Sequence, residues 1–212
     1  MLFSKTLQNI VLSSVCALSA LPAQAATTVV DFNSLATVTT NQTVIVPQPY
    51  SEDGFRLTTS SGSPQAGYGG GTIYALTDKH PHWMGSPAVF SGVITNYGSS
   101  FVLDRADGGV FDLLSMDVGL LNNYRHFDVY GYYPQGGYVH QYTFLEYTYA
   151  TLQTITFGNG FKGVNKLVFS SVYAQVDNIN LSVTAVPEPE TYALMLAGLG
   201  LVGFAARTRR YC

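Results

Sequence analysis

Two aspartates in apolar surroundings are the candidate metal ligands of this chain. Asp177 alternates in phase with Ile179 and further apolar residues, so a strand there would place its carboxylate on the apolar face. A carboxylate at the edge of a core is costly unless it is compensated, and a structural Ca²⁺ held by carboxylate and carbonyl oxygens is one compensation. Asp31, in the first strand-like segment, is the predicted companion ligand, with Glu52 and Asp53 as outside candidates.

Hydrogen bonding is the commoner compensation for a buried acid. Backbone N–H groups, or an arginine such as Arg56, would donate hydrogen bonds to Asp177, and we favour this arrangement over a bound ion. One measurement separates the two interpretations, because only a bound ion makes the melting temperature rise when calcium is added.

Aromatic residues in glycine- and proline-rich segments are candidate sugar contacts. Flat rings at a loop edge stack on sugar faces, while nearby polar groups supply hydrogen bonds. Trp83 is the only tryptophan, and its position at the end of His80-Pro81-His82-Trp83 is the sharpest hint. The predicted contacts are Trp83, Tyr68, Tyr74 and His82. Alternatively these rings cover the ends of the fold, which the general burial of aromatic residues favours.

Catalytic patterns have little support in this sequence. No G-x-S-x-G elbow appears, and both cysteines lie in the end segments. His80 and His82 lack the further ligands that a zinc site needs close in sequence. We therefore predict no enzyme activity, and no cofactor other than the candidate calcium.

The composition excludes several classes of protein. Of the 212 residues 47% are hydrophobic and only 11% are charged, so the chain is not an ordinary disordered polymer. The formal net charge of −3 offers no basic surface, so we exclude nucleic acid as a partner. Two cysteines, one near each end, cannot make a disulfide scaffold.

Short strand-like segments separated by Gly, Pro, Asn and Asp predict an all-β domain. Their number and spacing favour a jelly-roll-like antiparallel β-sandwich of two sheets. Gly136-Gly137 and Asn159-Gly160 are compact turn signals, each expected between hairpin partners. The expected strands are Thr27–Phe32, Thr43–Val46, Gly54–Thr59, Thr72–Leu76, Ala88–Phe90, Ser100–Leu103, Val110–Val118, Phe127–Tyr133, Val139–Leu145, Leu152–Phe157, Lys166–Ser170 and Val176–Val183.

Residues 1–25 have the pattern of a secretory signal peptide. Lys5 precedes an apolar run from Ile10 to Leu21, and Ala23-Gln24-Ala25 forms a small-x-small cleavage site. The apolar run is shorter than the roughly 20 residues that a membrane span needs. We expect removal of the signal after Ala25, which leaves a β-sandwich domain of residues 26–186.

Residues 187–212 have the pattern of a sorting signal. The segment Val186, Pro187, Glu188, Pro189 is expected to be extended and accessible, because proline fixes φ and lacks a backbone donor. Residues 192–206 carry no charge and are expected to form a single transmembrane helix about 22 Å long. The basic stop that follows, expected to stay cytoplasmic, is Arg207, Arg209 and Arg210.

The order of these three features resembles the PEP-CTERM sorting domain of exported proteins from Gram-negative bacteria that make exopolysaccharide. The resemblance covers Val186 to Arg210. It implies processing by a membrane protease-transpeptidase, the exosortase, with an inner-membrane anchor beforehand and the cell surface or extracellular matrix as destination. The same tail is also called the ice-binding protein C-terminal domain, a name that is no evidence of ice binding. The core is loosely similar to the β-sandwich domains common in PEP-CTERM and carbohydrate-binding proteins.

Together these features predict an exported, non-enzymatic surface or exopolysaccharide-matrix protein whose sandwich binds glycan. Two alternatives stay open: a purely structural or adhesive surface protein, and a secreted glycan hydrolase or lyase, which would need two facing carboxylates. The expected partners are the exosortase, the inner membrane before processing, and a polysaccharide.

Overall fold

Residues Ala26–Val183 form one compact unit in the structure, which is a computed structural model. The residues described are 25–35, 41–61, 68–69, 71–92, 99–121, 123, 125–148, 151–170, 174–184 and 195–200. Every member of the main hydrophobic cluster lies between Val30 and Leu181. This unit therefore contains a complete core of its own.

The predicted end segments fall mostly outside the described residues. This applies to the signal peptide before Ala25, to the sorting residues 186–189 and to the basic stop at 207–210. Within the predicted membrane segment, residues 195–200 are helical. Among the described residues, no helix has both the length and the apolar character needed to cross a bilayer.

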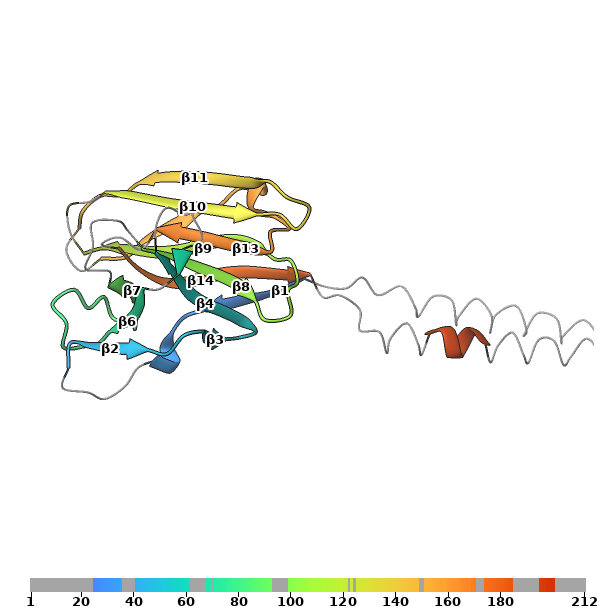
Figure 1. Cartoon of the computed structure of the whole chain (residues 1–212), viewed down its shortest axis with the longest axis horizontal. Coiled ribbons are helices and arrows are strands. Elements are labelled where there is room, and N and C mark those ends of the chain that lie inside the picture. The colour runs from blue at the N-terminus through green and yellow to red at the C-terminus, as the bar shows by residue number, and fades with distance from the viewer. Residues whose placement is uncertain are drawn as a thin grey trace, which may run out of the picture. The chain divides into compact units, whose positions relative to one another are not determined.

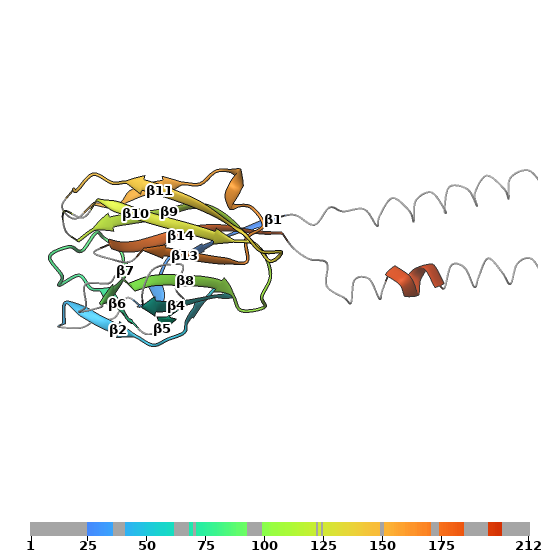
Figure 2. The same ribbon diagram turned by 45° about the horizontal axis from the view of Figure 1, so that its top comes forward.

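The unit is a sandwich of two antiparallel seven-stranded sheets, which confirms the predicted fold class (Figures 1 and 2). Sheet A contains, in spatial order, β12 (Gln153–Thr156), β9 (Asp112–Leu120), β14 (Ala174–Thr184), β7 (Val89–Gly92), β6 (Thr72–Leu76) and β2 (Thr43–Val46), with β1 (Ala25–Val30) beside β14. Sheet B contains β11 (Tyr138–Phe144), β10 (His126–Tyr132), β13 (Lys166–Ser170), β8 (Ser99–Arg105), β4 (Phe55–Ser61) and β3 (Tyr50–Glu52), with β5 (Tyr68–Gly69) beside β4. Two short 3₁₀ turns are η1 (Asn33–Leu35) and η2 (Asn159–Phe161).

All twelve expected strands are present, three of them with the predicted bounds, namely β2, β6 and β13. The short strands β3 and β5 were not predicted. One turn prediction was wrong, because Asn159-Gly160 does not join hairpin partners. The preceding strand β12 pairs with β9 in sheet A, whereas β13 pairs with β10 and β8 in sheet B. At this point η2 carries the chain from one sheet to the other and buries Phe161 between them.

Alternation along β10 separates the core from the outer surface. Phe127 and Val129 are fully buried and point inward, while their neighbours in sequence are only partly buried. Gly131 is the next inward-facing residue of β10, and there is little room for a side chain at this position. A Cβ there would approach Val164 to 2.9 Å and Phe161 to 3.1 Å. Its lack of a side chain lets the connection through η2 pack directly against the sheet.

The β10–β11 hairpin fixes which residues of β11 face outward. The turn residues are Pro134 and Gln135, and Gly136 and Gly137 close the connection with φ of +95° and +86°, a backbone region that favours glycine. The turn sets Tyr132 opposite Tyr138, and the pairing continues to His126 opposite Phe144. A slip of one residue would turn every aromatic side chain of β11 inward, so this turn decides the character of the surface.

Candidate functional site

The outward side chains of β10 and β11 form an exposed aromatic surface, here called the aromatic face. On the edge strand β11, Tyr138, Tyr142 and Phe144 are each more than half exposed, at 54%, 53% and 56%. Single exposed apolar residues are ordinary on a protein surface, but a contiguous row is a mark of binding. The aromatic face consists of Tyr138, His140, Tyr142 and Phe144 on β11 and His126, Tyr130 and Tyr132 on β10.

Cross-strand contacts hold these rings in place. Tyr130 and His140 stack with ring centroids 4.2 Å apart and planes 13° apart. The Tyr132 and Tyr138 rings lie 5.9 Å apart. At the other end His126 lies 5.7 Å from Phe144. Because pairs of this kind restrict the side-chain rotamers, the face is ordered before any ligand arrives.

Polar groups are interleaved with the rings. The Asp128 carboxylate lies 2.7 Å from Nε2 of His140, and the Tyr142 hydroxyl hydrogen-bonds with Nδ1 of His126. Burial raises the pKa of the Tyr130 phenol, with Asp128 adding to the rise, so this hydroxyl stays protonated at neutral pH and can donate a hydrogen bond. The face therefore combines flat apolar area with fixed donors and acceptors.

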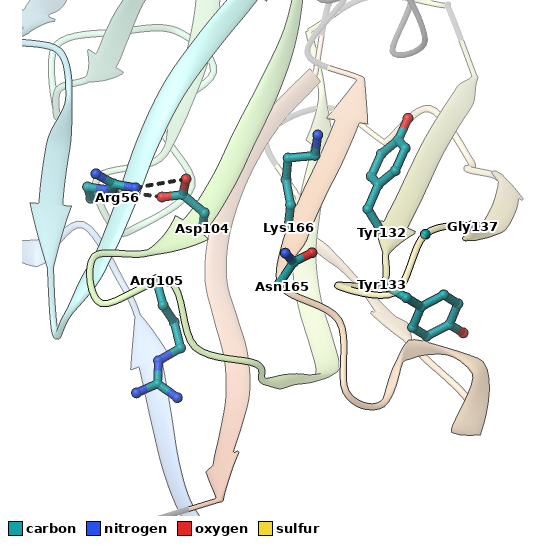
Figure 3. A pocket seen from close by; sticks show the side chains of 10 residues that line it. Arg56, Asp104, Arg105, Tyr132, Tyr133, Gly137, Asn165 and Lys166 are labelled. Carbon is teal, nitrogen blue, oxygen red and sulfur yellow. Dashed lines mark hydrogen bonds and ion pairs between the residues drawn. The ribbon is translucent and has the colours of Figure 1, made fainter. Parts of the chain in front are cut away.

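A shallow cavity of about 340 Å³ adjoins the aromatic face at the Tyr132 end (Figure 3). Its wall contains Arg56 and Asp104, joined by two hydrogen bonds of 2.9 and 3.0 Å. Lys166 lies on the side of the cavity next to Tyr132, and its Nζ is 4.4 Å from the centre of that ring. The cavity thus adds basic groups beside a surface that is mainly aromatic and has Asp128 as its acidic group.

The sugar contacts predicted from the sequence lie elsewhere in the fold and stay a prediction. Tyr74, on β6 in sheet A, stacks on Phe90 of β7 at 5.4 Å and lies opposite the exposed Ile45 of β2. Trp83 and His82 are half-buried in the connection between β6 and β7. The backbone of Tyr68 is in β5, and its side chain is outside the described residues. The predicted sugar contacts whose side chains the structure describes, Tyr74, His82 and Trp83, do not belong to the aromatic face.

Sequence reasoning missed the aromatic face although a signal was present. In β11 an aromatic ring occupies every second position from Tyr138 to Phe144. A period of two with aromatic residues in the phase opposite to Val139 marks one face of a strand. Gly136-Gly137 just before it also signals a hairpin with β10, although the register is set by the longer connection from Tyr133 to Gly137.

The candidate calcium ligands both engage donors within the protein. The fully buried Asp177 accepts hydrogen bonds from the Ser86 hydroxyl and from the backbone N–H of Asn178, the latter at 2.8 Å. Asp31 accepts from the backbone and the side-chain amide of Asn33 at 2.9 and 2.8 Å. Compensation by backbone N–H is thus what the structure shows at Asp177, and Arg56 pairs with Asp104 instead.

Metal binding at Asp31 and Asp177 stays a prediction. Among the described residues there is no group of three or more His, Cys, Asp or Glu side chains placed to share a metal ion. Of the outside candidates, Glu52 accepts the backbone N–H of Phe32 at 3.1 Å. A calcium titration followed by melting tests the ion directly, with a rise in melting temperature as the supporting result.

Replacing Asp177 by Asn is expected to stabilise the domain at neutral pH. Burial raises the pKa of Asp177 to about 6 from an ordinary value of 3.8. A carboxyl with a raised pKa contributes its full stability below pH 3.8, and that stability is lost as the pH rises through 6, by up to about 3 kcal/mol. Asn keeps an oxygen acceptor for the Asn178 N–H without the charge. We expect a gain of about 1–2 kcal/mol at pH 7.5 that shrinks towards pH 4.

Thermal melts of both proteins at pH 4, 6 and 7.5 in the presence of a chelator measure this gain. A variant that is equally destabilised at every pH would contradict the account, because the lost contacts would then outweigh the charge. A variant that melts lower than the parent only when calcium is added would instead support the ion.

The folded unit has a general likeness to solved carbohydrate-binding modules. A family 29 module from Piromyces equi aligns with a TM-score of 0.44 and 9% identity, covering 76% of this chain and 92% of the module. A family 32 module from C. perfringens in complex with galactose gives 0.35 and 12%, covering 65% of this chain and 98% of the module. A family 11 module from Clostridium thermocellum, in complex with a β-1,3-1,4-mixed-linked tetrasaccharide, gives 0.31 and 13%, covering 76% and 98%.

At TM-scores below 0.5 these likenesses concern general architecture, and no ligand follows from them. Among curated proteins none matches this sequence significantly.

The C-terminal end gives a specific match. Residues 185–210 match the family model of the PEP-CTERM protein-sorting motif. The matched range contains the proline-glutamate-proline segment at 187–189, the apolar stretch and the arginines. The chain therefore carries a PEP-CTERM sorting motif, which implies an exported protein that is sorted through the membrane and processed by an exosortase.

Proposed function

We propose that residues 26–186 form a polysaccharide-binding module that the sorting tail delivers to the cell surface or the extracellular matrix of a Gram-negative bacterium. The aromatic face is the proposed binding surface. The module binds without turnover, so its role is to attach the protein to a matrix polymer or to hold that polymer together.

The observation that carries this proposal is the row of three rings on β11 that are each more than half exposed. Leaving such area in water is unfavourable, at roughly 25 cal/mol per Å². A sugar ring has apolar C–H groups on its faces and hydroxyls at its edge. It therefore suits a surface where Tyr138 and Tyr142 offer flat area and Asp128 and His140 offer hydrogen bonds.

The extended shape of the face favours a polymer over a small sugar. The rings follow β11 from Tyr138 to Phe144, a rise of six residues or about 20 Å along the strand. A single monosaccharide would cover only one of these rings. A chain of sugars lying along the strand could contact several of them at once, and linking several weak contacts in one polymer raises its overall affinity well above that of each contact alone.

Electrophoresis of the 26–186 fragment through gels containing dissolved polysaccharides tests this function, since a bound polymer retards the protein. We expect retardation by at least one polymer in a panel of neutral and acidic glycans. Full mobility in every gel, including the exopolysaccharide of the producing cell, would favour the purely structural alternative.

Tryptophan emission distinguishes the aromatic face from the contacts predicted by the sequence. Trp83 is the only tryptophan and belongs to the β6–β7 connection of sheet A, not to the aromatic face. We expect a retarding polymer to leave the intensity and wavelength of its emission unchanged. A saturable change in emission would move the binding site to Trp83, Tyr74 and their neighbours.

A further inference from the structure

We infer that the polymer is acidic, and that Lys166 binds a carboxylate or sulfate group of its sugar repeat at the end of the aromatic face. This inference rests on the proposed function and adds the chemical class of the ligand. The observation behind it is the register of the paired strands in sheet B. Five strands of sheet B place one residue each in a single row of directly opposed positions: Arg56, Asp104, Lys166, Tyr132 and Tyr138.

The charges in this row leave one cation available. Asp104 lies between two basic residues, but both of its oxygens are engaged by Arg56, at 2.9 and 3.0 Å. Lys166 is exposed, and within the described part of the chain its ammonium forms no ion pair. Figure 3 shows the Lys166 side chain standing between Asp104 and Tyr132. The row therefore carries a net positive charge at Lys166.

The position of Lys166 suits an anionic sugar better than an isolated ion. Its Nζ lies over the Tyr132 ring, 4.4 Å from the centroid, and Tyr132 in turn contacts Tyr138. Neighbouring strands are about 4.8 Å apart, so Lys166 and Tyr138 are separated by about 10 Å across the sheet. An acidic group bound at Lys166 would thus leave the adjoining sugar over the Tyr132–Tyr138 pair. The side chain of Asn165 lines the same cavity and offers further hydrogen bonds.

The net charge of the whole domain limits how closely acidic groups can be spaced along a bound polymer. Residues 26–186 contain eleven acidic and six basic residues, so a densely charged polyanion is repelled overall. The positive site at Lys166 lies within a negative domain, so it favours isolated acidic groups over a dense array of them. The geometry therefore points to a polymer whose acidic groups are spaced by neutral sugars.

Three polymers test the inference on the 26–186 fragment: hyaluronan, with a single carboxylate per disaccharide, κ-carrageenan, with a single sulfate per disaccharide, and neutral agarose oligosaccharides. Affinity is measured by calorimetry or gel retardation for the parent, Lys166→Gln and Lys166→Arg. A hydrogen bond from an ammonium to an anionic group is stronger than a neutral one. We therefore expect Lys166→Gln to lose at least tenfold in affinity for an acidic polymer, and Lys166→Arg to lose less than threefold. Loss on hyaluronan alone assigns the site to carboxylate, and loss on κ-carrageenan alone assigns it to sulfate.

The outcomes separate this inference from the function beneath it. Equal affinity of the parent and Lys166→Gln for every polymer that is bound would overturn the inference, while the aromatic face would keep its role. Tighter binding of the neutral oligosaccharides than of both acidic polymers would also overturn it. Binding of none of the polymers, with the cell's own exopolysaccharide also unbound, would instead remove the proposed function. Because Lys166 is exposed, equal melting temperatures are expected for the three proteins.

Discussion

Replacing Tyr138, Tyr142 and Phe144 together by alanine is expected to lower the affinity of the 26–186 fragment for its polysaccharide at least 100-fold. Stacking removes on the order of 50–100 Å² of each ring from water, which is worth about 1–2 kcal/mol per ring. Contributions of neighbouring rings are not strictly additive. A total of about 3 kcal/mol for the three rings already corresponds to more than a hundredfold in the dissociation constant.

The fold should survive this triple substitution, because all three side chains point outward and are more than half exposed. Cross-strand pairs such as Tyr132–Tyr138 contribute about 0.2–1 kcal/mol each, so a fall of a few degrees in melting temperature is expected. Ile45→Ala is the matched control, since Ile45 is 65% exposed on β2 of the other sheet. A triple variant that binds as tightly as the Ile45 variant would contradict the assignment of the aromatic face.

Replacing Pro187, Glu188 and Pro189 together by alanine is expected to block processing and retain the protein in the membrane fraction. Proline fixes φ and has no backbone donor, so this segment is expected to be extended, and the glutamate is its only charge. Alanines in their place favour continuation of the helix expected at 192–206, which would hide the segment from the exosortase. Fractionation of the producing cell, followed by immunoblotting, measures the outcome.

The matched control for the tail is Glu190→Ala, which changes the residue next to the proline-glutamate-proline segment and should leave release unchanged. We expect the control and the parent to reach the cell surface or medium in equal amounts and the triple variant to accumulate, with at least a tenfold difference in the released fraction. Release of the triple variant at the parental level would contradict sorting through this motif.

Local sequence pattern was sufficient for most of the fold. Strands such as Thr43–Val46 and Lys166–Ser170 are bounded by turn residues and have strand composition, so their limits could be predicted. The short strand β3 was missed because Pro47 and Pro49 lie just before it and Ser51 and Glu52 give it a polar composition. The Asn159-Gly160 turn was recognised, but whether its flanking strands pair depends on tertiary packing that no local signal encodes.

The site was harder to predict than the fold, because it depends on pairing between distant residues. From the sequence, Trp83 and other aromatic residues in loops were predicted as the sugar contacts, since loops commonly carry function. The aromatic face instead lies on regular strands, and its rings act together only because β10 and β11 pair in the observed register. Lys166 joins them through the pairing of β13 with β10, across 34 residues of chain from Tyr132.

Resonances of selectively labelled tyrosine rings test the central claim most directly, because they report which surface meets the polymer. In the 26–186 fragment, assigned through single Tyr→Phe variants, addition of a retarding polysaccharide is expected to shift or broaden the ring signals of Tyr138, Tyr142 and Tyr132. The ring signals of Tyr74, on the outer side of sheet A, should stay unchanged. Perturbation of Tyr74 with Tyr138 and Tyr142 unaffected would contradict binding at the aromatic face.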